Sequence, residues 1–239
     1  MNNRQEEILQ KAAEELKNVY NSYHSQGLEA VYLWGSILRD DFKPESSDID
    51  SIGIADDSMD FALEKQIQTE LAGRIPGLSK FGFRLIYKSE LSGGKIKGFL
   101  SSVQSPKSHL LDLPNWQFIE GKRFQQSDFA KKLPTYLDAA KAEISELRKH
   151  QEKYKEHQVD DYPHFIKKIA QIVDLLQKQR GARGRFSYHD IVSKAPEGSL
   201  EKQVALALGD IKNSGYNIGV IKKHELLLHE FIEFIYTLE

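Results

Sequence analysis

The sequence predicts an α/β protein of the α+β kind, with an N-terminal mixed sheet covered by helices and a C-terminal α-helical bundle. Two observations predict this fold. Short β-rich runs alternate with helical segments only in the first half, whereas the second half consists of long, charged segments with helical spacing. A chain of 239 residues is long enough for two modest domains. This change in the pattern of apolar and charged residues places the first domain at residues 1–130 and the second at residues 131–239.

The elements of the first half follow from the spacing of apolar residues. Three- and four-residue spacing is typical of an amphipathic helix, and short continuous runs of apolar residues are typical of strands. Gly27 ends the first helix, and Pro76-Gly77 ends the second. In chain order, the expected elements are a helix over 4–25, strands over 30–34 and 49–55, a helix over 59–75 and a strand over 81–87.

The remaining elements lie on either side of residues 125–131, where the sequence changes from short apolar runs to long, charged segments with helical spacing. Before that point, HLLDLPNWQFIEGKRF carries two apolar stretches around Pro114-Asn115, which predicts a hairpin or a strand with a turn. Beyond it, the spacing predicts only helices, which would pack as a small bundle. They are expected over residues 128–159, 163–180, 199–213 and 222–238.

Composition excludes several classes of function. The 33 basic and 35 acidic residues give a formal charge of −2, so no global field would hold a nucleic acid, and no such partner is expected. The lack of cysteine excludes disulfides, a thiolate nucleophile and cysteine-ligated zinc. The polar start MNNRQEEILQ is unlike a targeting segment, and no apolar run approaches the ~18 residues of a membrane span. We therefore expect no membrane association and a cytoplasmic location.

The segment VYLWGSILRDDFKPESSDIDSIGI, residues 31–54, carries the side chains that suggest chemistry. Gly35 and Ser36 follow a strand-like run, where a glycine lets backbone amides approach phosphate oxygens and a serine adds a hydroxyl donor. Asp48 and Asp50 alternate on the next run, so both carboxylates are expected on one face of a strand. Two carboxylates beside a triphosphate suit Mg²⁺, which prefers carboxylate, phosphate and water oxygens. Together these parts predict nucleotidyl transfer.

The run from Gly35 to Arg39 (GSILR), followed by Ser47 to Asp50 (SDID), resembles the motif of the DNA polymerase beta-like nucleotidyltransferase superfamily. The bacterial branch with aminoglycoside adenylyltransferases and minimal nucleotidyltransferases is the most similar. The resemblance is most specific over residues 31–54 and extends loosely to about residue 130. It implies that Gly35 and Ser36 bind nucleotide phosphates, that the paired acids hold magnesium, and that Arg39 supports the loop or the nucleotide. In this family, a C-terminal helical domain commonly helps to form the acceptor site.

The expected function is therefore metal-dependent transfer of a nucleoside monophosphate to a hydroxyl of a small-molecule acceptor, such as an aminoglycoside-like compound. AMP from ATP is the favoured transfer, with other nucleoside triphosphates as alternative donors. Mg²⁺ is the expected cofactor, and Asp48 and Asp50 are the expected catalytic and metal-binding residues. A homodimer is compatible with the sequence.

The sequence departs from the family on the strand after the second helix. Many active members carry a third acid there, which completes the metal site or takes the proton of the acceptor hydroxyl. In this chain Gly82 or Arg84 occupies that position, depending on the register of the strand. Asp112 and Glu90 are the nearest substitutes along the chain, although a turn residue and a solvated strand end are their commoner roles. Ser51 is a milder departure, because relatives have an apolar residue there.

Because the third acid is missing, two other functions remain as alternatives to the active enzyme. A catalytically impaired pseudoenzyme would bind ATP and magnesium without turnover, whereas an antitoxin-like nucleotidyltransferase would act on a protein partner. The missing third acid favours the first rival. The helical second half argues against the second, because minimal antitoxins are much shorter.

Two further pairs of residues have alternative interpretations. Arg183 and His189 have a spacing that resembles the ribonuclease motif of HEPN helical domains, but a basic loop with a surface histidine is the commoner case. Trp34 is expected in the core beneath the motif. Trp116 is expected either to be exposed near a ligand or to cap the predicted hairpin.

Overall fold

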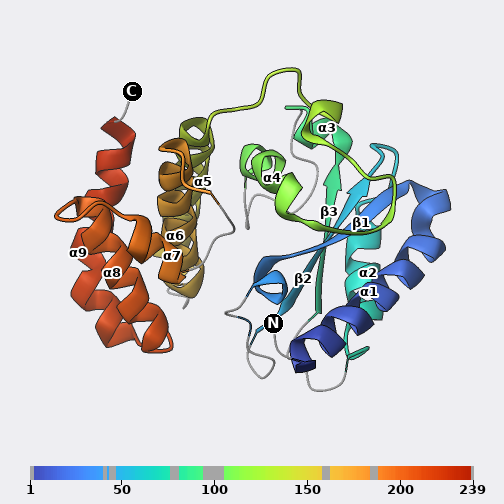
Figure 1. Cartoon of the computed structure of the whole chain (residues 1–239), viewed down its shortest axis with the longest axis horizontal. Helices are drawn as coiled ribbons and strands as arrows, with labels where there is room; N and C mark the ends of the chain where they lie inside the picture. Colours follow the sequence, from blue (N-terminus) through green and yellow to red (C-terminus); the bar gives the residue numbers. More distant parts are fainter. Residues whose placement is uncertain are drawn as a thin grey trace. The chain divides into compact units, whose positions relative to one another are not determined.

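The computed structural model describes residues 3–39, 42, 47–75, 81–93, 105–157, 162–183 and 188–237. Over this part of the chain, the fold is the mixed α/β arrangement that the sequence predicts, with a four-stranded sheet and helices (Figure 1). The chain divides into two compact units, Met1–Leu133 and Pro134–Glu239. Among the described residues, no helix is long and apolar enough to cross a membrane.

The first unit is built on a mixed sheet. Its strands are β1 (Leu28–Trp34), β2 (Ile49–Ala55), β3 (Phe81–Tyr87) and β4 (Gln117–Gly121), in the spatial order β3-β2-β1-β4. β1 is antiparallel to β2 and β4, whereas β2 and β3 are parallel. The end of β1 and the starts of the other three strands therefore meet at one end of the sheet. The strands predicted over 49–55 and 81–87 are confirmed, and β1 begins at Leu28 rather than at residue 30.

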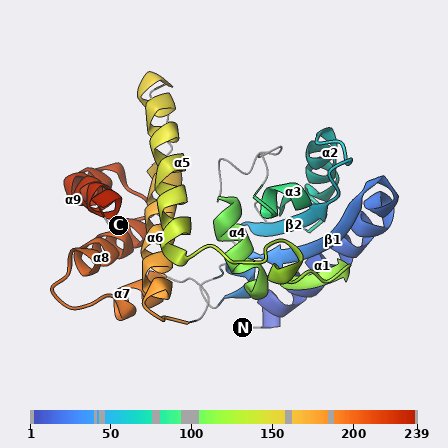
Figure 2. The ribbon, with the colours of Figure 1, turned by 90° about the horizontal axis from the view of Figure 1, so that it is seen from above.

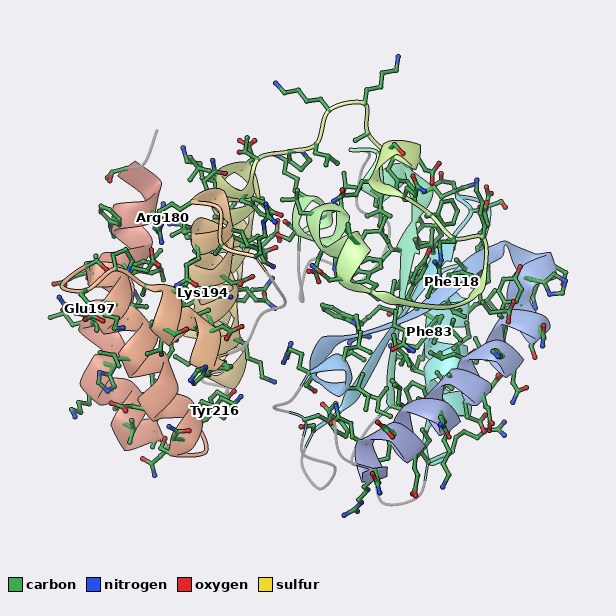
Figure 3. The ribbon with its side chains drawn as sticks, in the orientation of Figure 1. Phe83, Phe118, Arg180, Lys194, Glu197 and Tyr216 are labelled. Atoms are coloured by element: carbon green, nitrogen blue, oxygen red, sulfur yellow. The ribbon has the colours of Figure 1, made fainter. Side chains whose placement is uncertain are left out.

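One face of the sheet is covered by α1 (Asn3–Tyr23) and α2 (Ala62–Leu71) (Figure 1). Both helices bury their apolar sides against the strands, and Phe83 of β3 is fully buried in this core (Figure 3). α2 is shorter than the helix predicted over 59–75. It begins after Asp60, whose carboxylate accepts a hydrogen bond from the amide of Ala62 at 2.9 Å. Pro76 and Gly77, which are expected to end this helix, lie outside the described residues.

The opposite face packs against α3 (Lys88–Leu91) and α4 (Pro106–Asp112). Ile52 and Ile54 of β2 point into this second core. Because side chains alternate along a strand, Asp50 faces the same side as these two isoleucines. The carboxylate therefore belongs to the face that α4 covers.

α2 also binds the outer edge of β3 through two polar side chains. Gln68 donates its side-chain amide to the carbonyl oxygen of Phe83 at 2.7 Å, and the amide of Leu85 donates to Glu64 at 2.8 Å. Glu64 also lies 3.4 Å from Arg84. Burial raises the pKa of the Glu64 carboxyl above its ordinary value, although Leu85 and Arg84 act in the opposite direction.

Of the two arrangements predicted around Pro114-Asn115, the hairpin is wrong and the strand with a turn is confirmed. HLLDL belongs to α4 and to the 3-10 turn η4 (Leu113–Asn115), and only the following run forms a strand, β4. Ser105 explains the helix, because its hydroxyl accepts a hydrogen bond from the amide of Ser108 at 3.3 Å, while Pro106 occupies the first helical position.

The second unit is helical throughout its described part. Its helices are α5 (Tyr136–His157), α6 (Tyr162–Gln179), α7 (Tyr188–Lys194), α8 (Leu200–Asn213) and α9 (Ile218–Thr237). Figure 2 shows α5 and α6 lying side by side. The predicted start at residue 128 is too early, because Thr135 and Asp138 cap α5 by reciprocal hydrogen bonds of 2.7 to 3.0 Å. The sequence does not predict α7, which is too short to show a helical period.

Polar side chains join the helices of this unit internally. The ammonium of Lys168 on α6 pairs with the carboxylate of Glu143 on α5, and both side chains are almost completely buried. Gln177 of α6 donates to the carbonyl oxygen of Ile191 in α7 at 2.8 Å and to Glu201 of α8 at 3.0 Å. These bonds fix the register of the helices, because leaving such groups unpaired in the interior would be costly.

Candidate functional site

The residues after β1 form a tight turn. Gly35–Leu38 make one turn of 3-10 helix, η2, which the amide of Arg39 closes by donating to the carbonyl oxygen of Ser36 at 2.8 Å. Ile37 and Leu38 are buried, whereas Gly35, Ser36 and Arg39 remain partly exposed. The turn is thus anchored by its apolar side chains, and its polar members face away from the core.

The two aspartates lie at the same end of the sheet as this turn. Asp50 is the second residue of β2 and Asp48 immediately precedes the strand, and both are partly exposed. In the sheet register, Asp50 lies between Trp34 of β1 and Gly82 of β3. Directly opposed residues in a sheet share a face, so these three positions form one row across the strands.

Gly35 and the Asp50 carboxylate are in close contact. A Cβ atom at position 35 would lie 2.6 Å from Oδ2 of Asp50 and 3.3 Å from its Cβ, so a side chain there would collide with the aspartate. Gly35 also adopts φ +81°, in the left-handed region that favours glycine. The fold therefore brings together the turn and the carboxylate that the sequence analysis assigns to one site.

Gly82 occupies the β3 position beside the other oxygen of Asp50. A Cβ atom at position 82 would lie 3.8 Å from Oδ1 of Asp50 and 3.6 Å from the carbonyl oxygen of Ile49. Both are ordinary van der Waals distances, so a side chain would fit and would point toward the carboxylate. Of the two positions expected for the third acid, the register thus selects Gly82, and Arg84 instead contacts Glu64.

Ser51 has a structural explanation that the sequence alone does not provide. Its hydroxyl is almost completely buried and donates to the carbonyl oxygen of Gly82 at 2.8 Å. Glycine inside a strand is entropically unfavourable, and this hydrogen bond holds β3 against β2 at that residue. Positions 51 and 82, at which the sequence departs from the motif that it resembles, are therefore in direct contact.

The two substitutes for the third acid both have local structural partners. Asp112 accepts hydrogen bonds from the Asn115 side chain at 2.9 Å and from the indole of Trp116 at 3.3 Å. Glu90 is fully buried and accepts from the amide of Tyr87 at 3.1 Å, where it caps α3. The contacts of Asp112 agree with its commoner role as a turn residue, whereas the solvated strand end expected for Glu90 is wrong, because this residue is buried in α3.

Aromatic rings line the site face on the β1 side. The ring of Trp34 lies 5.5 Å from that of His109 on α4, and His109 lies 5.7 Å from Trp116, both in edge-on arrangements. His109 and Trp116 are buried. Trp116 therefore belongs to the core, and the prediction that it is exposed or caps a hairpin is wrong.

Gln5 of α1 is part of the turn's surroundings, although no feature of the sequence indicates it. Its side-chain amide donates to the carbonyl oxygens of Ile37 and Arg39, at 2.8 Å each. Thirty-two positions separate Gln5 from Ile37, so only the packing of α1 brings them together.

The donor set at this end of the sheet suits a hard divalent cation. Asp48 and Asp50 offer carboxylate oxygens, and the empty Cβ position of Gly35 leaves the turn backbone against Oδ2 of Asp50. Among the described residues, no three acidic or histidine side chains gather in a group that could hold a metal ion. A cation at the pair would therefore take further ligands from phosphate and water oxygens.

Arg183 and His189 lie in the second unit. The side chain of His189 is 91% exposed, Arg183 is exposed, and residues 184–187 lie outside the described part. The carbonyl oxygen of Arg183 accepts a hydrogen bond from Lys194 at 3.0 Å. This surface placement is typical of a basic loop with an exposed histidine.

Comparisons with known proteins give a likeness of fold. No family model matches the sequence, and no curated protein is similar to it by sequence. Among solved structures, the chain resembles spectinomycin adenyltransferase AAD(9) from Enterococcus faecialis, determined with ATP and spectinomycin. The TM-score is 0.55 at 13% identity, and the likeness covers 91% of this chain and 98% of that chain. The likeness of fold therefore extends over nearly the full length of both chains.

Proposed function

We propose that this protein binds ATP with Mg²⁺ at the end of β1 and transfers AMP to a hydroxyl of a small-molecule acceptor. The contact between Gly35 and the Asp50 carboxylate carries the proposal, because it places a phosphate-binding type of turn against a metal-binding type of side chain. The solved neighbour is an adenyltransferase determined with ATP and a small molecule, which supports the same classes of donor and acceptor.

Each group has a distinct task in this reaction. The amides at Gly35 and Ser36 and the Ser36 hydroxyl would bind the triphosphate tail, and Arg39 would support the turn or the nucleotide. Asp48 and Asp50 would hold Mg²⁺, whose charge offsets that of the triphosphate and of the departing pyrophosphate. The acceptor oxygen forms a bond to the α-phosphorus. At the same time, the bond breaks between that phosphorus and the oxygen that bridges the α- and β-phosphates. Pyrophosphate leaves, and the hydroxyl proton passes to water.

Gly82 favours a second candidate function, ATP and Mg²⁺ binding without turnover. Its position beside Oδ1 of Asp50 is where active relatives are expected to carry the third acid. A protein with this substitution would keep the nucleotide site and lose the group that takes the acceptor proton.

One experiment separates the two candidates. The purified chain is incubated with α-labelled ATP, Mg²⁺ and a panel of aminoglycosides, nucleosides and proteins, and both ATP binding and labelled product are measured. Asp50→Asn should abolish both signals, because it removes a carboxylate from the cation site. Asp60→Asn is the matched control, since an amide oxygen at position 60 still accepts the bond from Ala62.

Each result selects a different conclusion. Labelled product on a small-molecule hydroxyl supports the transferase, whereas label on a protein contradicts the proposed acceptor class. ATP binding with no product on any acceptor favours the binding protein. If the wild-type chain does not bind ATP, both candidates fail.

A further inference from the structure

The polar side chain of Gln5 connects α1 to the proposed phosphate-binding turn. Gln5, 2% exposed, donates both hydrogens of its side-chain amide, one to the carbonyl oxygen of Ile37 and one to that of Arg39. Both distances are 2.8 Å, which is a good length for such bonds. The bonds reach the last part of η2 and the residue that follows it.

A glutamine suits this position better than other side chains. Its terminal NH₂ supplies two donors on one neutral atom, which matches two converging carbonyl oxygens. A glutamate would present only acceptors to those oxygens, and a lysine would bring a charge into a buried place. An asparagine is one methylene shorter and would not reach both.

The surrounding core makes this attachment rigid. Ile8, one turn after Gln5 on α1, belongs to the same apolar cluster as Ile37 and Leu38 of the turn. The rest of α1 packs along β1 through the buried Ala12, Leu16 and Val19. The helix is thus fixed to the sheet, and Gln5 fixes the turn to the helix.

We propose that Gln5 is a positioning residue for the nucleotide site: it holds the turn 35–39 in the conformation that presents its amides and Ser36 to a triphosphate. This inference rests on the proposed function, because it assigns the turn to the nucleotide phosphates. Gln5 itself lies behind the turn and would act through the backbone of Ile37 and Arg39. Replacing Gln5 should therefore change the affinity for the phosphate tail more than the affinity for the rest of the nucleotide.

The test compares ATP and AMP affinities by calorimetric titration in the presence of Mg²⁺. Gln5→Met keeps the length of the side chain and removes both donors. Gln68→Met is the matched control, because Gln68 is another helical glutamine, and its amide donates to the carbonyl oxygen of Phe83 on β3 rather than to the turn. Thermal unfolding of each variant reports the change in stability separately.

We expect Gln5→Met to weaken ATP binding about tenfold, with a much smaller effect on AMP, because positioning is lost only at the phosphate turn. Gln68→Met should lower stability and leave the ratio of the two affinities unchanged. The proposal is overturned if both variants change this ratio equally or if neither changes it. A wild-type chain that does not bind ATP would instead refute the proposed function.

A second variant covers the case in which Gln5→Met does not fold. Gln5→Asn retains the amide but is too short to reach both carbonyl oxygens, so the ATP-to-AMP affinity ratio should fall by a smaller factor. A folded Gln5→Asn with the wild-type ratio would overturn the proposal as well.

Discussion

Two glycines flank the Asp50 carboxylate, and they differ in how much space they leave. On the side of β1, a Cβ atom at Gly35 would lie 2.6 Å from Oδ2, and the backbone has φ +81°. On the side of β3, a Cβ atom at Gly82 would lie 3.8 Å from Oδ1, with no positive φ. The first glycine is required by close approach and conformation, whereas the second could be replaced without strain.

Substitutions on the two sides of Asp50 should affect different properties, ATP binding on one side and turnover on the other. On its close side, the Asp50 carboxylate contacts the turn that we propose to bind phosphate, so changes there should affect ATP binding. The open side is where the family motif predicts a third acid, so changes there should affect the transfer step. Substitutions on the two sides should therefore give different kinetic signatures.

The largest effect is expected on the close side. Gly35→Ala would push the Asp50 carboxylate away from the turn, and we expect ATP affinity to fall about 100-fold, as a small misplacement of a bound group can cause. Gly73→Ala is the control, because Gly73 has a similar φ of +77° but no atom within 4 Å of its Cβ position. It bears the same backbone strain without the collision. Equal ATP affinities for the two variants in titration would contradict the importance of this contact.

A gain of function is expected on the open side. Gly82→Asp places a carboxylate beside Oδ1 of Asp50, and we expect product formation from labelled ATP to rise about tenfold, less than a fully positioned base contributes. Gly82→Asn has the same size but cannot take a proton at neutral pH. If both variants have the same rate, the missing acid is not what limits turnover.

A smaller effect is expected for Ser51, whose hydroxyl is hydrogen-bonded to Gly82. Ser51→Ala removes the hydroxyl that donates to the Gly82 carbonyl oxygen, and we expect a loss of about 1 kcal/mol in the free energy of unfolding. Ser22→Ala, at an exposed serine bonded within its own helix, should change it by much less. Urea unfolding measures both. An unchanged stability for Ser51→Ala would show that the hydroxyl does not hold β3 in place.

The smallest effect concerns the outer edge of β3. Burial raises the pKa of Glu64 above its unfolded value, so the folded state binds the proton more tightly, and stability is lost as pH rises through that raised pKa. Glu64→Gln keeps an acceptor for Leu85 without this titration. Compared with the wild type, its stability in urea unfolding should therefore increase over the pH range that begins near the ordinary pKa of a glutamate, about 4.3. A constant difference across this range would contradict the assignment.

Local patterns predict much of this fold, but not the contacts between distant segments. The strands over 49–55 and 81–87 could be predicted because each is a short apolar run bounded by polar residues. HLLDL is apolar enough for either a strand or a helix, and the deciding signal, the cap at Ser105 and Pro106, lies outside the run. Short runs of this kind take their conformation from their ends and from tertiary packing.

The contacts of the candidate site could likewise be predicted only in part from the sequence. The motif places Gly35 and Asp50 near each other, because one follows a strand and the other begins the next. The sequence leaves Gly82 and Arg84 equivalent, because the register between β2 and β3 cannot be predicted from it, and the structure places Gly82 opposite Asp50. Gln5 could not be predicted at all, since only the docking of α1 connects it with Ile37. The roles of the whole set stay predictions: Gly35, Ser36, Arg39, Asp48 and Asp50.

The attachment of α2 to β3 also bears on aggregation. A strand edge with unpaired amides and carbonyls can recruit a strand from another chain. At Phe83 and Leu85 these groups are already bonded to Gln68 and Glu64. A foreign strand could add at these positions only after α2 had detached. Transient opening of that one helix, rather than loss of the whole sheet, would then be the event that exposes this edge to self-association.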